Sequence, residues 1–117
     1  MKKITSKSGC AVETTLSVIG GTWKPIILFR LLLGKMRFMQ LAHSIPSVTQ
    51  RMLTLQLREL ECDGVILRTI YPEVPPRVEY ELTELGFSLQ PILEMMNDWG
   101  RNYQKINEVS NDKVDIT

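Results

Sequence analysis

Apolar residues recur at helical spacing near the start of the chain. Val12, Leu16 and Ile19 fall on one face of a helix, which predicts an amphipathic element. Gly20 and Gly21 follow directly, and glycine readily takes the left-handed conformation that ends helices. The pattern therefore predicts a first helix that ends at this glycine pair.

A second helix is predicted to start at Thr22 and to continue through residues 26–33, where most positions are apolar. Thr22 and Pro25 suit its start, since a hydroxyl can accept an orphan backbone N–H and proline costs no hydrogen bond in the first turn. Gly34 marks its end. A helix that is apolar on most sides belongs in the centre of a core.

Two further helices follow, separated by a break at Ile45-Pro46. The first covers residues 37–44. The second is predicted over residues 47–63, because Ser47 and Gln50 form the S-x-x-Q capping pattern. Its inward stripe consists of Leu53, Leu57 and Leu60.

After the fourth predicted helix, apolar and polar residues alternate instead of recurring at helical spacing. Residues 65–70 and 78–82 predict two strands, joined by a proline-rich connection at 71–76. Thr83 caps a last helix, which Pro91 kinks or divides and which ends in a polar tail after Ile106. The large apolar residues of this helix are Leu85, Leu89, Leu93, Met96, Trp99 and Tyr103.

The predicted order is four helices, a two-stranded β-hairpin and a long helix, which is typical of a winged helix-turn-helix. The fold class is α+β, mostly α. We expect one domain at residues 10–106, a flexible N-terminal arm at 1–9 and a polar C-terminal tail at 107–117.

The fourth predicted helix has the two sides that a recognition helix needs. Arg51, Thr54 and Arg58 lie on its polar side at i, i+3 and i+7, and Thr49 and Gln50 stand in its first turn. Arginine can bond guanine through two hydrogen bonds, and glutamine can bond adenine likewise. An ordinary solvated face is the weaker alternative, because the N-terminal half of this helix contains no acidic residue.

Further basic and hydroxyl side chains flank this helix. Arg77 stands at the wing, where it can enter the minor groove, contact a phosphate or simply face solvent. The other candidate DNA contacts are Lys24, Lys35, Arg37 and Ser47.

The net charge of +1 hides an asymmetry between the two ends of the chain. Residues 1–77 hold 11 Lys/Arg against 5 Asp/Glu, a balance of +6, whereas residues 78–117 hold 3 against 8, a balance of −5. A basic front and an acidic back suit a protein that faces a polyanion with one side. Chance segregation of surface charge would give the same picture.

Short runs between residues 10 and 101 carry a family resemblance. They are CAVE (10–13), IGGTWK (19–24), Arg37-Phe38 with Leu41, MLT (52–54), QLRELE (56–61), Asp63-Gly64, Arg68-Thr69, YPEVPPRVEY (71–80), LTELG (82–86) and Asp98-Trp99. Together they resemble the HxlR-type winged-helix regulators of bacteria, a MarR-like family, and the run at 71–80 is the most specific piece.

The resemblance implies a homodimer that binds inverted-repeat operator DNA, usually as a repressor. It also implies that the first and last helices form the dimer contact. The sequence agrees, because the last helix carries more large apolar groups than one small core needs, although some of them can complete the monomer core. The implied interface residues are Val12, Leu16, Leu89, Leu93, Met96, Trp99 and Tyr103.

The two cysteines lack metal-ligand spacing, which fits a reducing cytoplasm and no disulfide scaffold. Cys10 lies at the predicted start of the first helix near Lys7, where a thiolate is favoured. Some similar regulators sense electrophiles or oxidants with the matching cysteine, so Cys10 is either a redox switch or a packing residue near the dimer contact. Cys62 lies among acidic residues and is expected to be structural.

No pattern indicates catalysis. His43 has no cysteine or acidic partner at helical spacing, and no nucleophile elbow or phosphate-binding glycine loop occurs. We therefore expect no enzyme activity, no metal and no cofactor. The start of the chain does not match a signal peptide, and the longest apolar run, 26–29, is too short to span a bilayer, so we expect a cytoplasmic protein without membrane contact.

Two alternative functions stay open. A regulator that responds to an inducing small molecule without redox sensing could line an apolar cavity with Trp23, Met95, Met96 and Trp99, although such residues more often form core. A winged-helix protein-interaction module would have lost DNA binding, and the acid-free start of the fourth helix argues against it.

Overall fold

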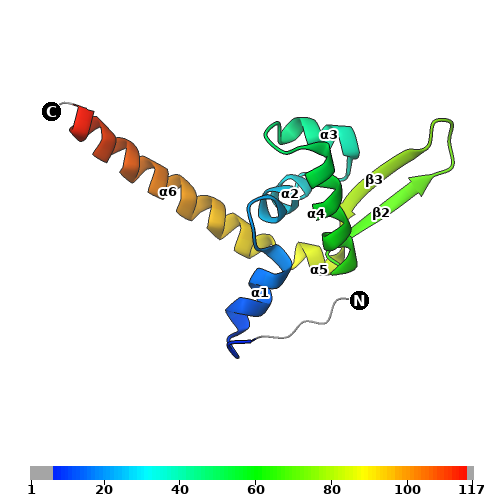
Figure 1. Ribbon diagram of the computed structural model, residues 1–117, viewed down its shortest axis with the longest axis horizontal. Coiled ribbons are helices and arrows are strands. Elements are labelled where there is room, and N and C mark those ends of the chain that lie inside the picture. Colours follow the sequence, from blue (N-terminus) through cyan, green and yellow to red (C-terminus); the bar gives the residue numbers. More distant parts are fainter. Residues whose placement is uncertain (1–6, 116–117) are drawn as a thin grey trace.

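The computed structural model describes residues 7–115, with side chains up to residue 108. Residues 1–6 of the expected arm and 116–117 of the expected tail lie outside the described residues. The elements are α1 (Ala11–Ile19), α2 (Trp23–Leu31), β1 (Met36–Arg37), α3 (Phe38–Ser44), α4 (Gln50–Cys62), β2 (Ile66–Tyr71), β3 (Arg77–Leu82), α5 (Glu84–Phe87) and α6 (Gln90–Asp115). Figure 1 shows α2, α3 and α4 in one body, from which α6 extends on one side and the β2–β3 hairpin on the other.

Both N-terminal helices form where the apolar pattern predicts them. α1 ends at Gly20, and Gly21 adopts a left-handed φ of +87°. A Cβ at Gly20 would collide with the carbonyl oxygen of Leu16, so this sharp exit requires glycine. In α2, Ile27 and Leu28 are fully buried, which confirms the prediction of a central helix.

The core lies where the leucine stripe of α4 meets α2 and the base of the sheet. Leu53, Leu57 and Leu60 are at most 1% exposed, as their spacing predicts. They share one cluster with residues of α2, α3, β2, β3 and α6: Ile27, Leu28, Leu31, Leu41, Ile66, Leu82 and Leu93. Burial of this stripe leaves the opposite, polar side of α4 at the surface.

The cap of α4 differs from the one that the S-x-x-Q pattern indicates. That pattern places the cap at Ser47, whereas the Thr49 hydroxyl accepts the Met52 N–H at 3.1 Å. The cause is a turn in which the buried Val48 donates its N–H to the carbonyl of Ile45 at 3.1 Å. Ser47 stays in this turn, so the prediction of a capping box there is wrong.

Replacing Thr49 by alanine is expected to lower the free energy of unfolding by about 1 kcal/mol, because a first-turn N–H loses its acceptor. Ser47→Ala is the matched control and is expected to change it by less than about 0.5 kcal/mol. Urea unfolding followed by far-ultraviolet circular dichroism measures both. A larger loss of unfolding free energy in Ser47→Ala than in Thr49→Ala would show that Ser47 is the capping residue.

The hairpin has the predicted antiparallel pairing and gains a third strand. β2 pairs with β3 from Ile66 opposite Leu82 to Tyr71 opposite Arg77. β1 pairs antiparallel with the other edge of β3, so the strand order is β1-β3-β2. The sequence indicated only the two-stranded hairpin, since a strand of two residues is too short to display alternation.

Pro91 divides the last helical region into α5 and α6, as predicted, and stands in the first turn of α6. The Thr83 hydroxyl accepts the Gly86 N–H at 3.1 Å and so caps α5. The predicted end after Ile106 is wrong, because α6 continues to Asp115 as an arm that leaves the body (Figure 1). No glycine or proline follows Ile106, and polar composition alone does not stop a helix.

Candidate nucleic-acid interface

α4 presents a basic stripe on the side opposite its buried leucines. Arg51 and Arg58 are exposed, and Thr54 is half-buried between them, at the predicted spacing. Leu55, which the spacing of polar residues did not indicate, is 48% exposed on the same side. The two guanidinium groups can bond guanine edges, and a leucine can contact a thymine methyl group.

The N-terminal end of α4 is open to solvent. Ser47, Thr49 and Gln50 are all exposed there. The Thr54 hydroxyl donates to the Gln50 carbonyl oxygen at 2.8 Å, so only its lone pairs remain for a base, as acceptors. The positive end of the α4 dipole points out at this end and favours a phosphate.

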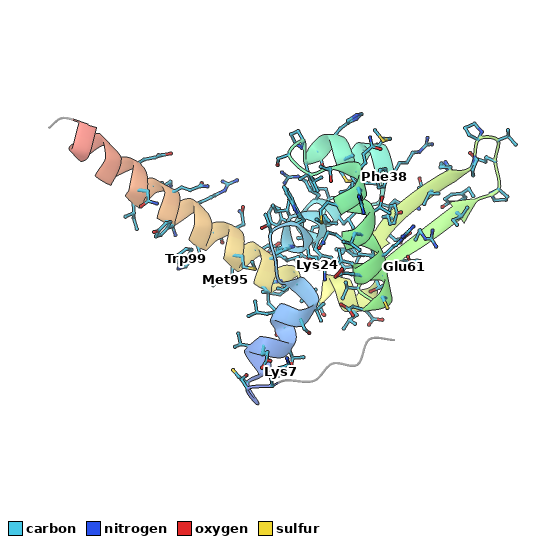
Figure 2. The ribbon with its side chains drawn as sticks, viewed as in Figure 1. Lys7, Lys24, Phe38, Glu61, Met95 and Trp99 are labelled. Atoms are coloured by element: carbon cyan, nitrogen blue, oxygen red, sulfur yellow. The ribbon has the colours of Figure 1, made fainter. Side chains whose placement is uncertain are left out.

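A polar recess of about 220 Å³ lies between α4 and the sheet, beside the basic stripe. Arg58, Glu61, Arg68 and Tyr80 line it, and Figure 2 places Glu61 on the side of α4 that faces the hairpin. Arg68 Nε lies 3.4 Å from Glu61 Oε1, and both side chains are partly exposed. Such a pair is weak, so a phosphate can displace Glu61 from Arg68.

Arg68 is a candidate contact that sequence reasoning missed. Arg68 stands inside the predicted strand at 65–70, where no local pattern marks it as a contact. What places it beside Arg58 is the packing of β2 against α4, which no local pattern displays.

Tyr80 closes the inner wall of this recess. Burial raises the pKa of its hydroxyl from the ordinary 10.0, Arg68 and Arg58 partly offset that rise, and Glu61 adds to it. Tyr80 therefore keeps its proton at neutral pH and can donate a hydrogen bond to a phosphate oxygen.

Arg77, the predicted wing contact, is engaged within the wing. Its Cζ lies 4.1 Å from the centroid of the Tyr71 ring, and its Nη2 lies 3.3 Å from Glu73 Oε1. Glu73 is half-exposed, so this ion pair is weak and can exchange for a phosphate. The most exposed apolar side chain of the tip is Val74.

The prediction that Lys24 contacts a phosphate is wrong. Its side chain is only 8% exposed, and its Nζ donates to Glu59 Oε1 at 2.7 Å. Figure 2 places it near the middle of the molecule. Because a buried ammonium needs a counter-charge, Lys24 binds the carboxylate of α4 and fixes this helix against α2. It is a structural residue beneath the interface.

Lys35 and Arg37 lie ahead of α3, and both are exposed. Arg37 stands opposite Glu79 in the β1–β3 pair. Their exposure leaves both side chains accessible, so their contact with phosphate stays a prediction.

Comparison with known proteins agrees with this geometry. The model of the HxlR-like helix-turn-helix family matches residues 18–108. The chain belongs to that family. The HTH-type transcriptional regulator YdeP of Bacillus subtilis (strain 168) is 58% identical over 96 residues, which are 82% of this chain and 75% of YdeP.

Solved structures give the same result. The redox regulator HypR in its oxidised form matches with a TM-score of 0.77 and 55% identity, over 80% of this chain and 96% of HypR. A regulator assigned to the MarR family, from Porphyromonas gingivalis W83, matches with a TM-score of 0.77 and 35% identity, over 86% of this chain and 97% of that protein. The HxlR-like protein is therefore a winged-helix transcriptional regulator of the HTH type and not an enzyme, as the sequence predicted.

The HxlR-like protein also displays a large apolar surface on α1 and α6. Trp99 is 68% exposed, and its ring stacks on Tyr103 with a centroid distance of 5.1 Å. Figure 2 shows Met95 and Trp99 on one side of α6. The exposed large apolar residues on these two helices are Val12, Leu16, Ile92, Met95, Met96, Trp99, Tyr103 and Ile106.

Two residues of the predicted dimer contact pack in or against the monomer core instead. Leu93 is only 2% exposed and lies in the monomer core, so it offers no surface to a partner. Leu89 is half-buried against the same core. The physical reason is that the start of α6 packs on α2, whereas the following turns leave the body.

The alternative of a cavity lined by all four tryptophan and methionine residues is not what the structure shows. Met95, Met96 and Trp99 line an open groove of about 600 Å³ along α6. Trp23 instead packs against the core from α2 and takes no part in this groove.

Cys10 is exposed at the N-cap position of α1. Its N–H donates to the Ser8 hydroxyl at 3.2 Å, and the Glu13 carboxylate folds back to accept the N–H groups of Lys7 and Ser8. Cys62 is exposed at the end of α4 and is therefore not a buried packing residue, and its expected lack of a sensing role stays a prediction.

His43, for which the sequence indicated no metal or catalytic role, is exposed on α3. Within residues 7–115, no cluster of three or more His, Cys, Asp and Glu residues could hold a metal ion. None of the described helices is long and apolar enough to cross a membrane.

Proposed function

We propose that this HxlR-like protein is a repressor that binds an inverted-repeat operator as a homodimer and is switched by oxidation or alkylation of Cys10. The observation that carries the proposal is the exposed stripe of α4, where Arg51 and Arg58 flank Thr54 opposite a buried leucine stripe. A helix held in this way can enter the major groove with its polar side toward the base edges.

The contacts divide by chemistry. Arg51, Arg58 and Gln50 have the side chains that discriminate bases, and Leu55 adds an apolar contact. The phosphate contacts are assigned to the exposed cationic and hydroxyl groups around this stripe: Lys35, Arg37, Ser47, Thr49, Arg68 and Arg77. Phosphate contacts fix the position of the helix and make affinity fall steeply with salt. The proposal includes a cytoplasmic location, where the operator DNA would be reached.

Dimerisation is proposed through α1 and α6. Their exposed apolar side chains form a surface larger than scattered single residues would, and such surfaces mark association sites. Trp99 and Tyr103 are the side-chain types that dominate interface energies. A two-fold dimer would present two α4 helices to two half-sites of an inverted repeat.

Replacing Trp99 by glutamate is expected to weaken the dimer by at least about 2 kcal/mol, because it buries an unpaired charge in the contact. Light scattering after size exclusion should then shift from twice the 13.4 kDa chain mass toward a single chain. Arg101→Glu is the control, since Arg101 lies on the opposite side of α6 and should leave the mass unchanged. Equal masses for wild type and Trp99→Glu would contradict the proposed interface.

The thiol switch is supported by the exposure of Cys10 on α1 and by the likeness to the redox regulator HypR. Diamide removes two electrons and two protons from two thiols as their S–S bond forms. A disulfide between Cys10 and another cysteine or a small thiol would therefore alter the start of α1.

The test is a mobility shift on the DNA that flanks the gene of this protein, before and after diamide. Diamide is expected to change operator binding in wild type and Cys62→Ser but not in Cys10→Ser. An unchanged response in Cys10→Ser would remove the switch and leave the DNA-binding proposal intact. Operator binding indifferent to diamide in wild type would favour a small ligand as the signal.

A further inference from the structure

A cavity of about 280 Å³ lies behind the DNA-binding surface. Its walls come from α1, from the junction between α4 and β2, and from α5 with the start of α6. The residues that matter here are Thr15, Val18, Asp63, Val65, Ser88 and Leu89. None of them belongs to the proposed operator contacts, which lie on the exposed side of α4 and in the wing.

Asp63 is the unusual residue of this cavity. Both of its carboxylate oxygens are shielded from solvent, and neither has a hydrogen-bond partner among the described residues. Asp63 also caps the C-terminal end of α4, where the helix dipole already presents negative charge. A buried carboxylate without a counter-charge is costly, so this site favours the arrival of a cation.

Two of the three hydroxyl groups that line the cavity also favour a cation with hydrogen-bond donors. The Thr15 hydroxyl donates its proton to the Ala11 carbonyl at 3.3 Å, and the Ser88 hydroxyl donates to the Leu85 carbonyl at 2.5 Å. Each oxygen is then left with lone pairs only, as an acceptor. Among the residues that the structure describes, no lysine, arginine or histidine lines the cavity. Its polar groups therefore suit a ligand that brings hydrogen-bond donors and positive charge.

We propose that this cavity binds a small organic ammonium ion whose N–H groups donate to Asp63 and whose apolar body packs on Val18, Val65 and Leu89. Charge-assisted hydrogen bonds to a shielded carboxylate supply the specificity for a cation. The apolar walls supply the preference for a hydrocarbon body over a bare inorganic ion.

The position of the cavity gives such a ligand a regulatory role, and this part rests on the proposed function. Asp63 directly follows the last residue of α4, while Thr15 and Val18 belong to α1, a helix of the proposed dimer contact. A ligand that bridges them favours one placement of α4 relative to the dimer. Operator and ammonium ligand should then change each other's affinity by the same factor.

The test compares benzylamine, benzyl alcohol and benzoate, which share a shape and differ in charge, on the full chain. Benzylamine is expected to raise the melting temperature with saturation and to shift amide resonances of the cavity residues. Benzyl alcohol and benzoate are expected to bind at least about tenfold more weakly, because they lose the charge-assisted bonds. Asp63→Asn should lose benzylamine binding to a similar extent, whereas Glu108→Gln, which removes an exposed carboxylate far along α6, should keep it.

Equal binding of the three probes, or equal benzylamine binding by wild type and Asp63→Asn, would overturn the inference. If Asp63→Asn does not fold, Val18→Phe fills the cavity instead and should abolish the resonance shifts. Operator binding without ligand is measured in parallel. If the protein binds its operator but not benzylamine, the ligand site alone is overturned. If it binds benzylamine but no operator, the proposed function alone is overturned.

Discussion

Replacing Arg51 by alanine is expected to weaken operator binding by about 1–3 kcal/mol, or roughly 5- to 150-fold. Arg51 is exposed in the first turn of α4, on the side opposite the buried leucines. A guanidinium there can form two hydrogen bonds with a guanine edge, and alanine forms neither. Fluorescence anisotropy titration of a labelled operator duplex measures the loss.

The same titration on an unrelated duplex of equal length separates base reading from phosphate contact. A base-reading Arg51 contributes mainly to the operator, so the ratio of the two affinities should fall. Arg101→Ala is the matched control, because it removes the same side chain from an exposed face of α6. An equal loss on both duplexes would make Arg51 a phosphate contact, and no loss on either would remove it from the interface.

Replacing Glu59 by glutamine is expected to lower the free energy of unfolding by about 2 kcal/mol. The Lys24 ammonium is nearly buried, and its partner at 2.7 Å is this carboxylate. Because the Glu59 side chain is 45% exposed, the effect should be smaller than for a fully buried pair. Urea unfolding gives the value, and Lys24→Met combined with Glu59→Gln should recover part of the loss.

Glu61→Gln provides the control on the same helix. Glu61 pairs with Arg68 at 3.4 Å, and both side chains are substantially exposed, so its loss should cost less than about 1 kcal/mol. Equal destabilisation by the two substitutions would show that burial of Lys24 adds nothing to the pair, against the role assigned to it.

The elements of this fold were predictable where their apolar and polar residues recur with a regular period. The leucine stripe of α4 and the alternation of β2 and β3 reflect local periodicity, which a sequence displays directly. The start of α4 could not be predicted, because Ser47 and Thr49 have equal capping chemistry and the burial of Val48 decides between them. Thr22 likewise occupies the N-cap position of α2 without making a cap hydrogen bond.

In the candidate site, too, local spacing predicted some residues, whereas contacts between distant segments decided others. The exposed face of α4 follows from helical spacing, so Arg51 and Arg58 were predictable. Lys24 looked like a surface lysine because its partner is 35 residues away in sequence. Leu93 and Trp99 both belong to the apolar pattern of α6, and only the packing of α6 on α2 separates a core residue from an exposed one.

The most direct test of the account is selection of bound duplexes from a random pool by the reduced, full-length protein, followed by sequencing. Two α4 helices related by a two-fold axis predict enrichment of an inverted repeat. Its half-site centres should lie about 10–10.5 base pairs apart, or a multiple of that spacing. Recovery of duplexes with no sequence enriched over the starting pool would contradict sequence-specific operator recognition through α4.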